Sequence, residues 1–253
     1  MICLSVVSHG QQDIALRFLR ALAELRPLLV SQVIYTCNLP EPDLPPLELG
    51  HIRLVTLRNL SAKGFSENHN AAFKLCAAPY FGVVNPDILL PSDPFPALVE
   101  AFEDTSVGVV APVVASPALE VENTSRRLYT PFELLRQKLR PSNLGEHGDW
   151  LAGMFLLFRS RAFRAVKGFD EGYFLYIEDV DICTRLRLAG WTLRQCASAQ
   201  VIHDARKTSH RSLRYTVWHL RGMFRYWRSP TFWRYRRLLL DRRQRHAGGR
   251  GAG

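Results

Sequence analysis

Residues 2–38 read ICLSVVSHGQQDIALRFLRALAELRPLLVSQVIYTCN, and their pattern decides the fold class. The apolar run at 2–8 predicts a short buried strand, and residues 11–25 place apolar side chains at helical spacing. Residues 32–38 return to a strand pattern. A strand, a helix and a second strand in this order are typical of a βαβ unit, whose two strands run parallel.

The same alternation continues beyond this unit. It predicts strands and helices in turn at 51–57, 66–78, 80–87, 93–104 and 107–112. We therefore expect an α/β fold with a mostly parallel central sheet and flanking helices. The second half is less regular, with a helix and loop expected at 126–139, a strand at 149–160, a short helix at 161–169 and a helix at 178–190.

Ligands of such sheets bind outside the carboxyl ends of the strands. That rule selects three short segments as candidate binding positions. They are SHG (8–10), TCN (36–38) and NPD (85–87).

Charge divides the chain into two parts. The 253 residues carry a net charge of +10, yet the segment from Arg206 onward holds fourteen Lys and Arg against one acid, Asp241. We expect a domain at 1–205 and a basic, aromatic helical tail at 206–253, the last residues disordered. Five scattered cysteines form no CxxC pair and favour a reducing cytosol. Neither a signal peptide nor a membrane-spanning run is expected.

The segment GFDEGYFLYIEDVDICTRLRLAGW (168–191) crowds five acids into a basic protein. Acids in the first turn of a helix complement its dipole. From this segment alone, that structural role is supported as well as a catalytic role is. However, three acids in four residues repel one another, and one or two would suffice as caps. The aromatic run YFLYI before them would form an apolar wall that raises the pKa of a carboxylate toward that of a useful base.

Taken with GFSENHNAAF (64–73), NPDILL (85–90) and DWLAGMFLLF (149–158), this segment resembles the family 2 glycosyltransferases of the GT-A fold. The likeness covers about residues 2–205 and is nearest in style to rhamnosyltransferase-like members of bacterial cell-surface polysaccharide pathways. It implies transfer of a sugar, with inversion, from a nucleoside-diphosphate donor, usually with Mg²⁺ or Mn²⁺.

The resemblance also implies roles for the acids. Asp179, the second acid of the ED pair, matches the general base, and Glu178 and Asp181 would be its supporting acids. Asp87 matches a metal-binding acid, although Asn85 stands where the family has a first aspartate. His203 matches a histidine that some relatives use as a further metal ligand. A turn at 85–87 and a structural histidine are the alternatives.

For the donor, the resemblance points to strand ends and to one helix start: Ser8, His9, Cys37, Asn38, Asn70 and Asn85. Cys37 stands where the family often has an aspartate that contacts the base, which leaves Asn38 as the nearby polar group. Asn70 has helix capping as its alternative. Trp150 matches an aromatic beside the acceptor, with burial in the core as its alternative.

In the tail, Leu213, Val217, Leu220, Phe224 and Trp227 recur at helical spacing. Basic residues flank this stripe, and a basic helix with aromatic side chains suits an anionic membrane surface. The residues assigned to that contact are Arg214, Trp218, Arg221, Arg225, Trp227 and Arg228. Packing of the stripe on the domain and nucleic-acid binding are the alternatives.

The sequence thus predicts an inverting, metal-dependent glycosyltransferase, with rhamnose as the first guess for the sugar. Its expected acceptor is lipid-linked or a glycan, and its expected place is the cytoplasm, at the inner face of the cell membrane. A catalytically silent membrane scaffold and a nucleic-acid-binding protein that uses the basic tail are the other interpretations. Nucleic acid is not an expected partner, because binding it gives no reason for the motif order at 64–191.

Overall fold

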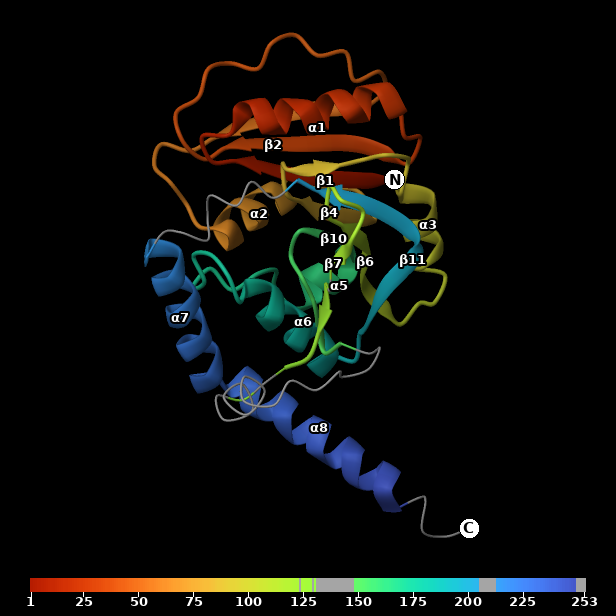
Figure 1. Ribbon diagram of the computed structural model, residues 1–253, viewed down its shortest axis with the longest axis vertical. Helices are drawn as coiled ribbons and strands as arrows, with labels where there is room; N and C mark the ends of the chain where they lie inside the picture. Colours follow the sequence, from red (N-terminus) through yellow and green to blue (C-terminus); the bar gives the residue numbers. More distant parts are fainter. Residues whose placement is uncertain (123, 129, 131–147, 205–212, 249–253) are drawn as a thin grey trace.

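A mixed sheet forms the centre of the computed structural model, which describes residues 1–122, 124–128, 130, 148–204 and 213–248 (Figure 1). Its strands are β1 (Ile2–Ser8), β2 (Val30–Cys37), β3 (Arg53–Arg58), β4 (Tyr80–Val84), β5 (Ile88–Leu89), β6 (Val107–Ala115), β7 (Val121–Glu122), β10 (Phe155–Arg159) and β11 (Thr192–His203). Two further strands, β8 (Ser125–Arg126) and β9 (Trp150–Leu151), pair with each other.

The strands follow the order β3-β2-β1-β4-β10-β6-β11-β5, and β7 pairs with β6. The first four run parallel, β10 is antiparallel to β4 and β6, and β11 returns parallel to β6. The predicted α/β fold with a mostly parallel sheet is therefore confirmed. The expected strand at 149–160 is interrupted between β9 and β10, and this interruption forms part of the site described below.

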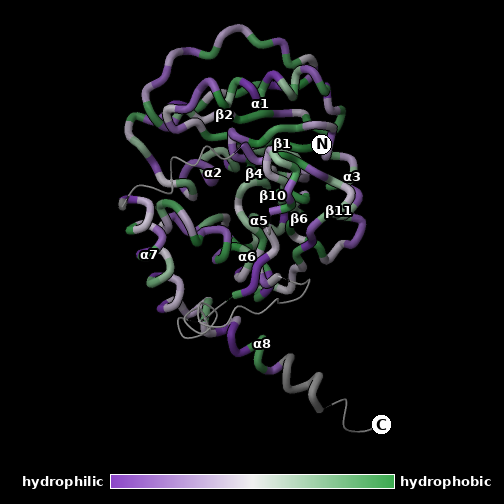
Figure 2. The backbone as a smooth tube through the Cα atoms, in the orientation of Figure 1, coloured by the Kyte–Doolittle hydropathy of each residue, from purple (hydrophilic) through white to green (hydrophobic). Residues whose placement is uncertain are grey.

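Helices cover both faces of the sheet. They are α1 (Gln12–Leu25), α2 (Phe65–Phe73), α3 (Phe95–Glu100), α5 (Ser160–Ala165) and α6 (Glu178–Leu188). Alternation along β1 explains the two layers, since Ile2, Leu4 and Val6 pack with α1 and α3 while Cys3 faces α2, α5 and α6. Figure 2 shows the apolar character of these central strands.

The basic C-terminal segment forms two helices, α7 (Leu213–Arg228) and α8 (Pro230–Gly248). Tyr226, Phe232 and Tyr235 are buried against Tyr173 and Val180, which belong to α6 and the loop before it. The two helices therefore share a core with the residue 1–205 segment, whereas the far end of α8 projects away from it (Figure 1). Residues 131–147 and 205–212, which hold most of the expected helix and loop at 126–139 and the start of the tail, lie outside the described residues.

Candidate functional site

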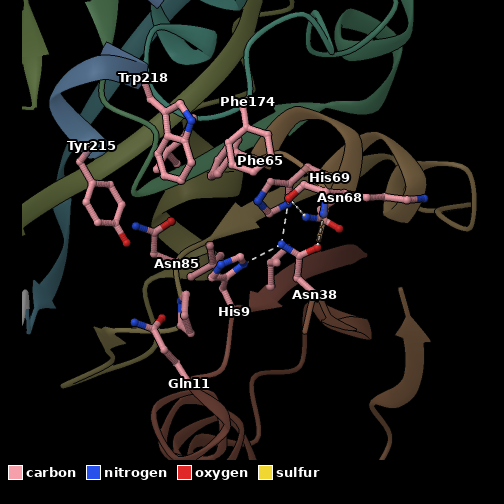
Figure 3. Close-up of a pocket in the computed structure, with 15 residues that line it drawn as sticks. His9, Gln11, Asn38, Phe65, Asn68, His69, Asn85, Phe174, Tyr215 and Trp218 are labelled. Carbon is pink, nitrogen blue, oxygen red and sulfur yellow. Dashed lines mark hydrogen bonds between the residues drawn. The ribbon is translucent and has the colours of Figure 1, made fainter. Parts of the chain in front are cut away.

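A cleft of about 210 Å³ lies at the carboxyl ends of β1, β2 and β4 (Figure 3). His9, Asn38 and Asn85 line it, as the sequence predicted, together with residues from α2, the loop before α6 and α7. The position agrees with the rule that parallel α/β sheets bind ligands at this edge. The cleft is the candidate nucleotide site.

A network of amide side chains fixes the floor of this cleft. The Asn38 side chain donates to the Lys63 carbonyl at 2.9 Å and accepts from the Lys63 backbone N–H at 2.8 Å, and it contacts His9 Nδ1 at 2.8 Å. Asn59 donates to the Oδ1 atoms of Asn38 and Asn68. The sequence patterns did not single out Asn59, Lys63 or Asn68, and only Asn68 lies within the quoted GFSENHNAAF motif at 64–73.

Buried polar groups continue beneath the cleft. His69 lines it from below, with Nδ1 2.8 Å from Ser5 Oγ. Burial lowers the pKa of His69 to about 3, so its imidazole is neutral at physiological pH. A neutral ring at this depth is a fixed hydrogen-bonding group that does not titrate in the working range.

Aromatic side chains from three distant segments close the other side. Figure 3 shows Phe65 of α2, Phe174 of the loop before α6, and Tyr215 and Trp218 of α7 around the cleft. The ring centroids of Phe174 and Trp218 are 4.8 Å apart. The run YFLYI was predicted to form an apolar wall beside the acids, whereas its Phe174 and Leu175 line the cleft, which none of the acids of α6 lines.

Two members of the predicted membrane-facing set, Trp218 and Arg225, make contacts with the rest of the domain. Trp218 packs on Phe174, and the Arg225 guanidinium donates to both carboxylate oxygens of Asp170, at 3.1 and 2.9 Å. Arg214 lies over the Trp218 ring at 4.6 Å and is exposed. Arg221 and Arg228 are exposed as well, and Trp227 is half-buried against the α6–α8 core.

Three other donor-site predictions fall on residues outside the cleft. The Ser8 hydroxyl donates to Glu41 Oε1 at 2.5 Å, and Cys37 is buried, which raises the pKa of its thiol. The side-chain amide of Asn70 bonds to the loop before α6. It donates to the Phe169 carbonyl and to the Glu171 carboxylate, and it accepts from the Phe169 N–H. None of these three side chains lines the cleft.

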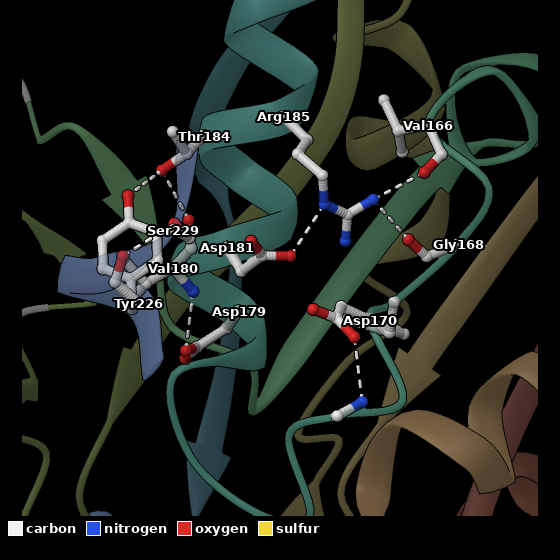
Figure 4. A network of polar contacts seen from close by, with 12 residues as sticks. Val166, Gly168, Asp170, Asp179, Val180, Asp181, Thr184, Arg185, Tyr226 and Ser229 are labelled. Carbon is white, nitrogen blue, oxygen red and sulfur yellow. Dashed lines mark hydrogen bonds and ion pairs between the residues drawn. The ribbon is translucent and has the colours of Figure 1, made fainter. Parts of the chain in front are cut away.

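The acids of the 168–191 segment separate into different roles (Figure 4). Asp181 is buried and accepts from Arg185 Nε at 2.7 Å, and Arg185 also donates to the carbonyls of Val166 and Gly168. Burial raises the pKa of Asp181 and the Arg185 charge opposes that rise. Asp181 is thus a structural ion-pair partner and not a neighbour of the Asp179 carboxylate.

Asp179 faces the opposite side of α6. Its Oδ2 accepts from the Gly153 N–H at 2.9 Å, and its Oδ1 accepts from the Val180 N–H at 2.8 Å. Burial raises the pKa of this carboxyl, while these two N–H donors hold the rise in check.

Glu178 is buried beside Asp179, and its Oε2 has no hydrogen-bond partner among the described residues. Burial, followed by the charge of Asp179, raises the pKa of Glu178 well above its ordinary value. A protonated Glu178 next to an ionised Asp179 avoids the repulsion that two adjacent carboxylates would otherwise suffer. Because the two buried carboxyls are adjacent, ionisation of Asp179 raises the pKa of Glu178.

The chain before α6 adopts an unusual conformation. Tyr176 and Ile177 have φ values of 70° and 73°, a left-handed conformation that is rare for non-glycine residues and rarer for a β-branched one. The Phe65 N–H holds this loop from α2 by donating to the Phe174 carbonyl at 2.7 Å. On the other side, a Cβ at Gly222 of α7 would lie 3.0 Å from the Tyr176 carbonyl oxygen.

Asp87 and His203 meet at the edge of the sheet, with Asp87 Oδ2 3.4 Å from His203 Nε2. Glu122 lies 3.4 Å from the other ring nitrogen, so the three side chains do not converge on one point. Burial alone would lower the pKa of His203, but the hydrogen bond and charge of Asp87, with Glu122, raise it. Across the described residues, no three Asp, Glu, His or Cys side chains form a metal cage.

Two groups here nevertheless suit a divalent cation. Asp87 Oδ1 is buried without a hydrogen-bond partner among the described residues, and the His203 imidazole is beside it. One carboxylate oxygen and one imidazole nitrogen fit Mn²⁺ or Mg²⁺ when diphosphate oxygens supply further ligands.

Trp150, the predicted acceptor-side residue, is half-buried in β9 and donates its indole N–H to the Arg127 carbonyl at 3.3 Å.

The chain is similar to known glycosyltransferases. The family model described as "Glycosyltransferase like family 2" matches residues 46–225. Rhamnosyltransferase WbbL of Escherichia coli K12 is 45% identical over 82 residues, which cover 31% of this chain and 30% of that protein. An N-acetylglucosaminyl-diphospho-decaprenol L-rhamnosyltransferase of Mycobacterium tuberculosis is 30% identical over 189 residues, 63% of this chain and 61% of the relative.

Solved structures agree on the fold. GalNAc-T7 with UDP, GalNAc and Mn²⁺ superposes with a TM-score of 0.63 at 14% identity, over 82% of this chain and 44% of that one. At that identity the likeness shows the shared GT-A architecture alone.

Proposed function

The chain belongs to the glycosyltransferase-like family 2, and from that membership we propose that it transfers a sugar with inversion, using Asp179 as the general base. The observation that carries this proposal is the interruption between β9 and β10. There the Gly153 N–H donates to Asp179, and the next residue, Met154, accepts from the Asn85 N–H at 2.9 Å. Two adjacent residues thus connect the carboxylate to the cleft edge at the end of β4.

Asp179 has the electrostatics that a base in this position needs. The helix N-terminus and two N–H donors stabilise its ionised form, whereas burial raises its pKa and makes the carboxylate more basic than an exposed one. Glu178, which holds its proton to higher pH, leaves the charge on Asp179. Both effects serve proton abstraction.

In the proposed step the acceptor hydroxyl oxygen attacks the anomeric carbon of the donor sugar. The bond between that carbon and the diphosphate oxygen breaks, its electron pair leaves with the diphosphate, and the hydroxyl proton passes to Asp179. Displacement from the opposite face inverts the configuration. A divalent cation held by Asp87 and His203 would neutralise the departing diphosphate.

The proposed donor is a nucleoside-diphosphate sugar, with deoxythymidine-diphosphate rhamnose as the first candidate. The rhamnosyltransferase names of two relatives support this sugar, and the cleft at the ends of β1, β2 and β4 supports the nucleotide. Asn38 and His9 offer hydrogen bonds to a base or ribose, and Phe65 offers an aromatic surface.

The proposed acceptor is carried on a lipid, which the name of the mycobacterial relative suggests. No helix among residues 1–122, 124–128, 130, 148–204 and 213–248 is long and apolar enough to span a bilayer. Instead, Val217, Leu220 and Phe224 of the predicted stripe are 43%, 49% and 62% exposed and do not pack on the domain. With exposed Arg221 and Arg228 beside them, they form a basic, apolar surface suited to the membrane interface.

Replacing Asp179 with Asn tests the catalytic assignment. Transfer from the sugar nucleotide to a polyprenyl-diphosphate acceptor should fall by about 10²–10⁴-fold, because the base is lost while the shape is kept. Nucleotide affinity, measured by calorimetry, should stay nearly unchanged. Glu171→Gln, which removes an acid from the same segment, is the control, and full transfer by Asp179→Asn would assign the base to another residue.

A further inference from the structure

A second cavity lies on the side of α6 away from Asp179. Its volume is about 620 Å³, and it is bounded by the chain at 166–173, by α6 and by the joint between α7 and α8. Four cationic side chains line it, Lys167, Arg185, Arg225 and Arg228, against two carboxylates, Asp170 and Asp181. The cavity therefore carries an excess of positive charge.

The two carboxylates are already matched. Asp170 accepts both bonds from Arg225, and Asp181 accepts from Arg185 Nε. The excess charge thus belongs to Lys167 and Arg228, which are exposed and which no described carboxylate approaches within ion-pairing distance. A cavity with spare cations at its rim is suited to an anion.

A buried donor in this wall also lacks an acceptor. Arg185 Nη2 is buried and has no hydrogen-bond partner among the described residues, although Nε and Nη1 of the same guanidinium bond Asp181 and two carbonyls. Leaving a buried charged donor unsatisfied is costly. An anion oxygen would reach this shielded donor only if the cavity wall moved to admit it.

The backbone adds a donor at the same place. Ser229 caps α8, with its Oγ accepting the Phe232 N–H at 3.1 Å, and Thr231, which lines the cavity, lies in the first helical turn. Pro230 has no N–H, and the N–H groups of Ser229 and Phe232 are already bonded, so the Thr231 N–H is the first-turn donor without a helical acceptor. The dipole of α8, a 19-residue helix, favours a negative charge there. Hydroxyl, guanidinium and ammonium groups together match the several acceptor oxygens of a phosphate.

The cavity also borders the exposed stripe of α7. Arg228 follows Phe224 by one helical turn, so it contacts the cavity and flanks the apolar surface at once. A phosphate group entering from a membrane on which the stripe lies would meet Arg228 first.

We propose that this cavity is a phosphate-binding site, distinct from the donor cleft, that takes the phosphomonoester headgroup of an anionic lipid. The lipid source rests on the membrane association proposed above, whereas the phosphate site does not. A headgroup bound there would hold the joint between α7 and α8 in one conformation. It would also keep the cleft-lining side of α7 at a constant distance from the membrane surface.

The test uses lipid preference, because general charge attraction cannot produce it. Full-length protein is sedimented with phosphatidylcholine vesicles made equally anionic by phosphatidic acid or by oleate, whose charge is a carboxylate. Wild type should prefer phosphatidic acid by about tenfold, the scale of one or two charge-assisted hydrogen bonds. Lys167→Gln with Arg228→Gln should bring the ratio close to one. Arg221→Gln with Arg234→Gln, two exposed arginines outside the cavity, should weaken both bindings and keep the ratio.

A calorimetric titration with glycerol 3-phosphate separates the two sources of phosphate. One outcome is that wild type binds glycerol 3-phosphate while the Lys167→Gln/Arg228→Gln variant does not, and that wild type shows no preference for phosphatidic acid vesicles. That result would support the phosphate site and assign it to a soluble phosphate ester. No preference for phosphatidic acid and no such binding would overturn the proposal. Failure of wild type to bind any vesicle would contradict membrane association alone, since the titration still tests the cavity.

Discussion

At the scale of single residues, three neighbouring acids of α6 have different environments. Asp181 pairs with Arg185, Asp179 accepts two backbone N–H groups, and Glu178 is buried with one oxygen unpaired. Helical geometry is the cause, because residues two apart on a helix point to nearly opposite sides. The three acids are therefore close in the sequence, but their carboxyl groups do not all gather at one point.

Glu178 should make the stability of the protein depend on pH. Its pKa is raised in the folded state, so between the unfolded and the folded pKa the native protein binds more protons than the unfolded chain. The stability that Glu178 contributes is present at acid pH and is lost as pH rises through its folded pKa. Urea unfolding across this range should show wild type losing stability relative to Glu178→Gln, and parallel curves for the two proteins would contradict the assignment.

At the scale of elements, the site depends on a loop held between two helices. The left-handed pair Tyr176–Ile177 leads directly into α6, and it is supported by Phe65 on one side and by Gly222 of α7 on the other. Strain of this kind persists only when the surroundings impose it. We infer that α7 helps to set both the cleft wall at Phe174 and the entry to Asp179.

Replacing Gly222 with Leu should separate α7 from this loop. No side chain fits there without moving the Tyr176 carbonyl or Ile177, and overpacking of this kind costs about 1–3 kcal/mol. Nucleotide affinity should fall about tenfold, as calorimetry would show. The adjacent exposed position gives the control, Arg221→Leu, and equal affinities for the two variants would mean that α7 does not shape the cleft.

The sequence predicted local elements well and remote contacts poorly. Strand and helix periodicity located β1, α1, β2 and α6, and the rule for strand ends selected His9, Asn38 and Asn85. Tyr215 and Trp218 reach the cleft from a helix about forty residues beyond Phe174, and no local pattern encodes that contact. The stripe of α7 was recognised, but the opposite face, with Trp218 and Tyr226, is the one that packs.

At the scale of the whole molecule, α7 and α8 join the two functions proposed here. Their inner side completes a core with Tyr226, Phe232 and Tyr235, and the outer side of α7 exposes Val217 and Phe224. Removing the helices would open that core, so a deletion cannot isolate their role at a membrane. Substitution on the exposed side can.

Replacing Val217, Leu220 and Phe224 together with Ser should weaken sedimentation with anionic vesicles by more than tenfold, because three apolar side chains no longer enter the interface. The thermal midpoint should change little, since these side chains are already 43–62% exposed. Serine at Leu28, Leu60 and Leu119, exposed leucines elsewhere, is the matched control. Vesicle binding that falls equally in both triple variants would contradict the assignment of this face.

The central claim is a sugar-nucleotide site whose diphosphate end meets Asp87. The most direct measurement is calorimetric titration of wild type and Asp87→Ala with the diphosphates of thymidine, uridine and guanosine, with Mn²⁺ and with chelator. We predict that wild type binds one of them with Mn²⁺, that chelator weakens this binding, and that Asp87→Ala loses the metal-dependent part. Absence of binding to all three nucleotides would contradict the proposed enzyme and favour a catalytically silent membrane protein.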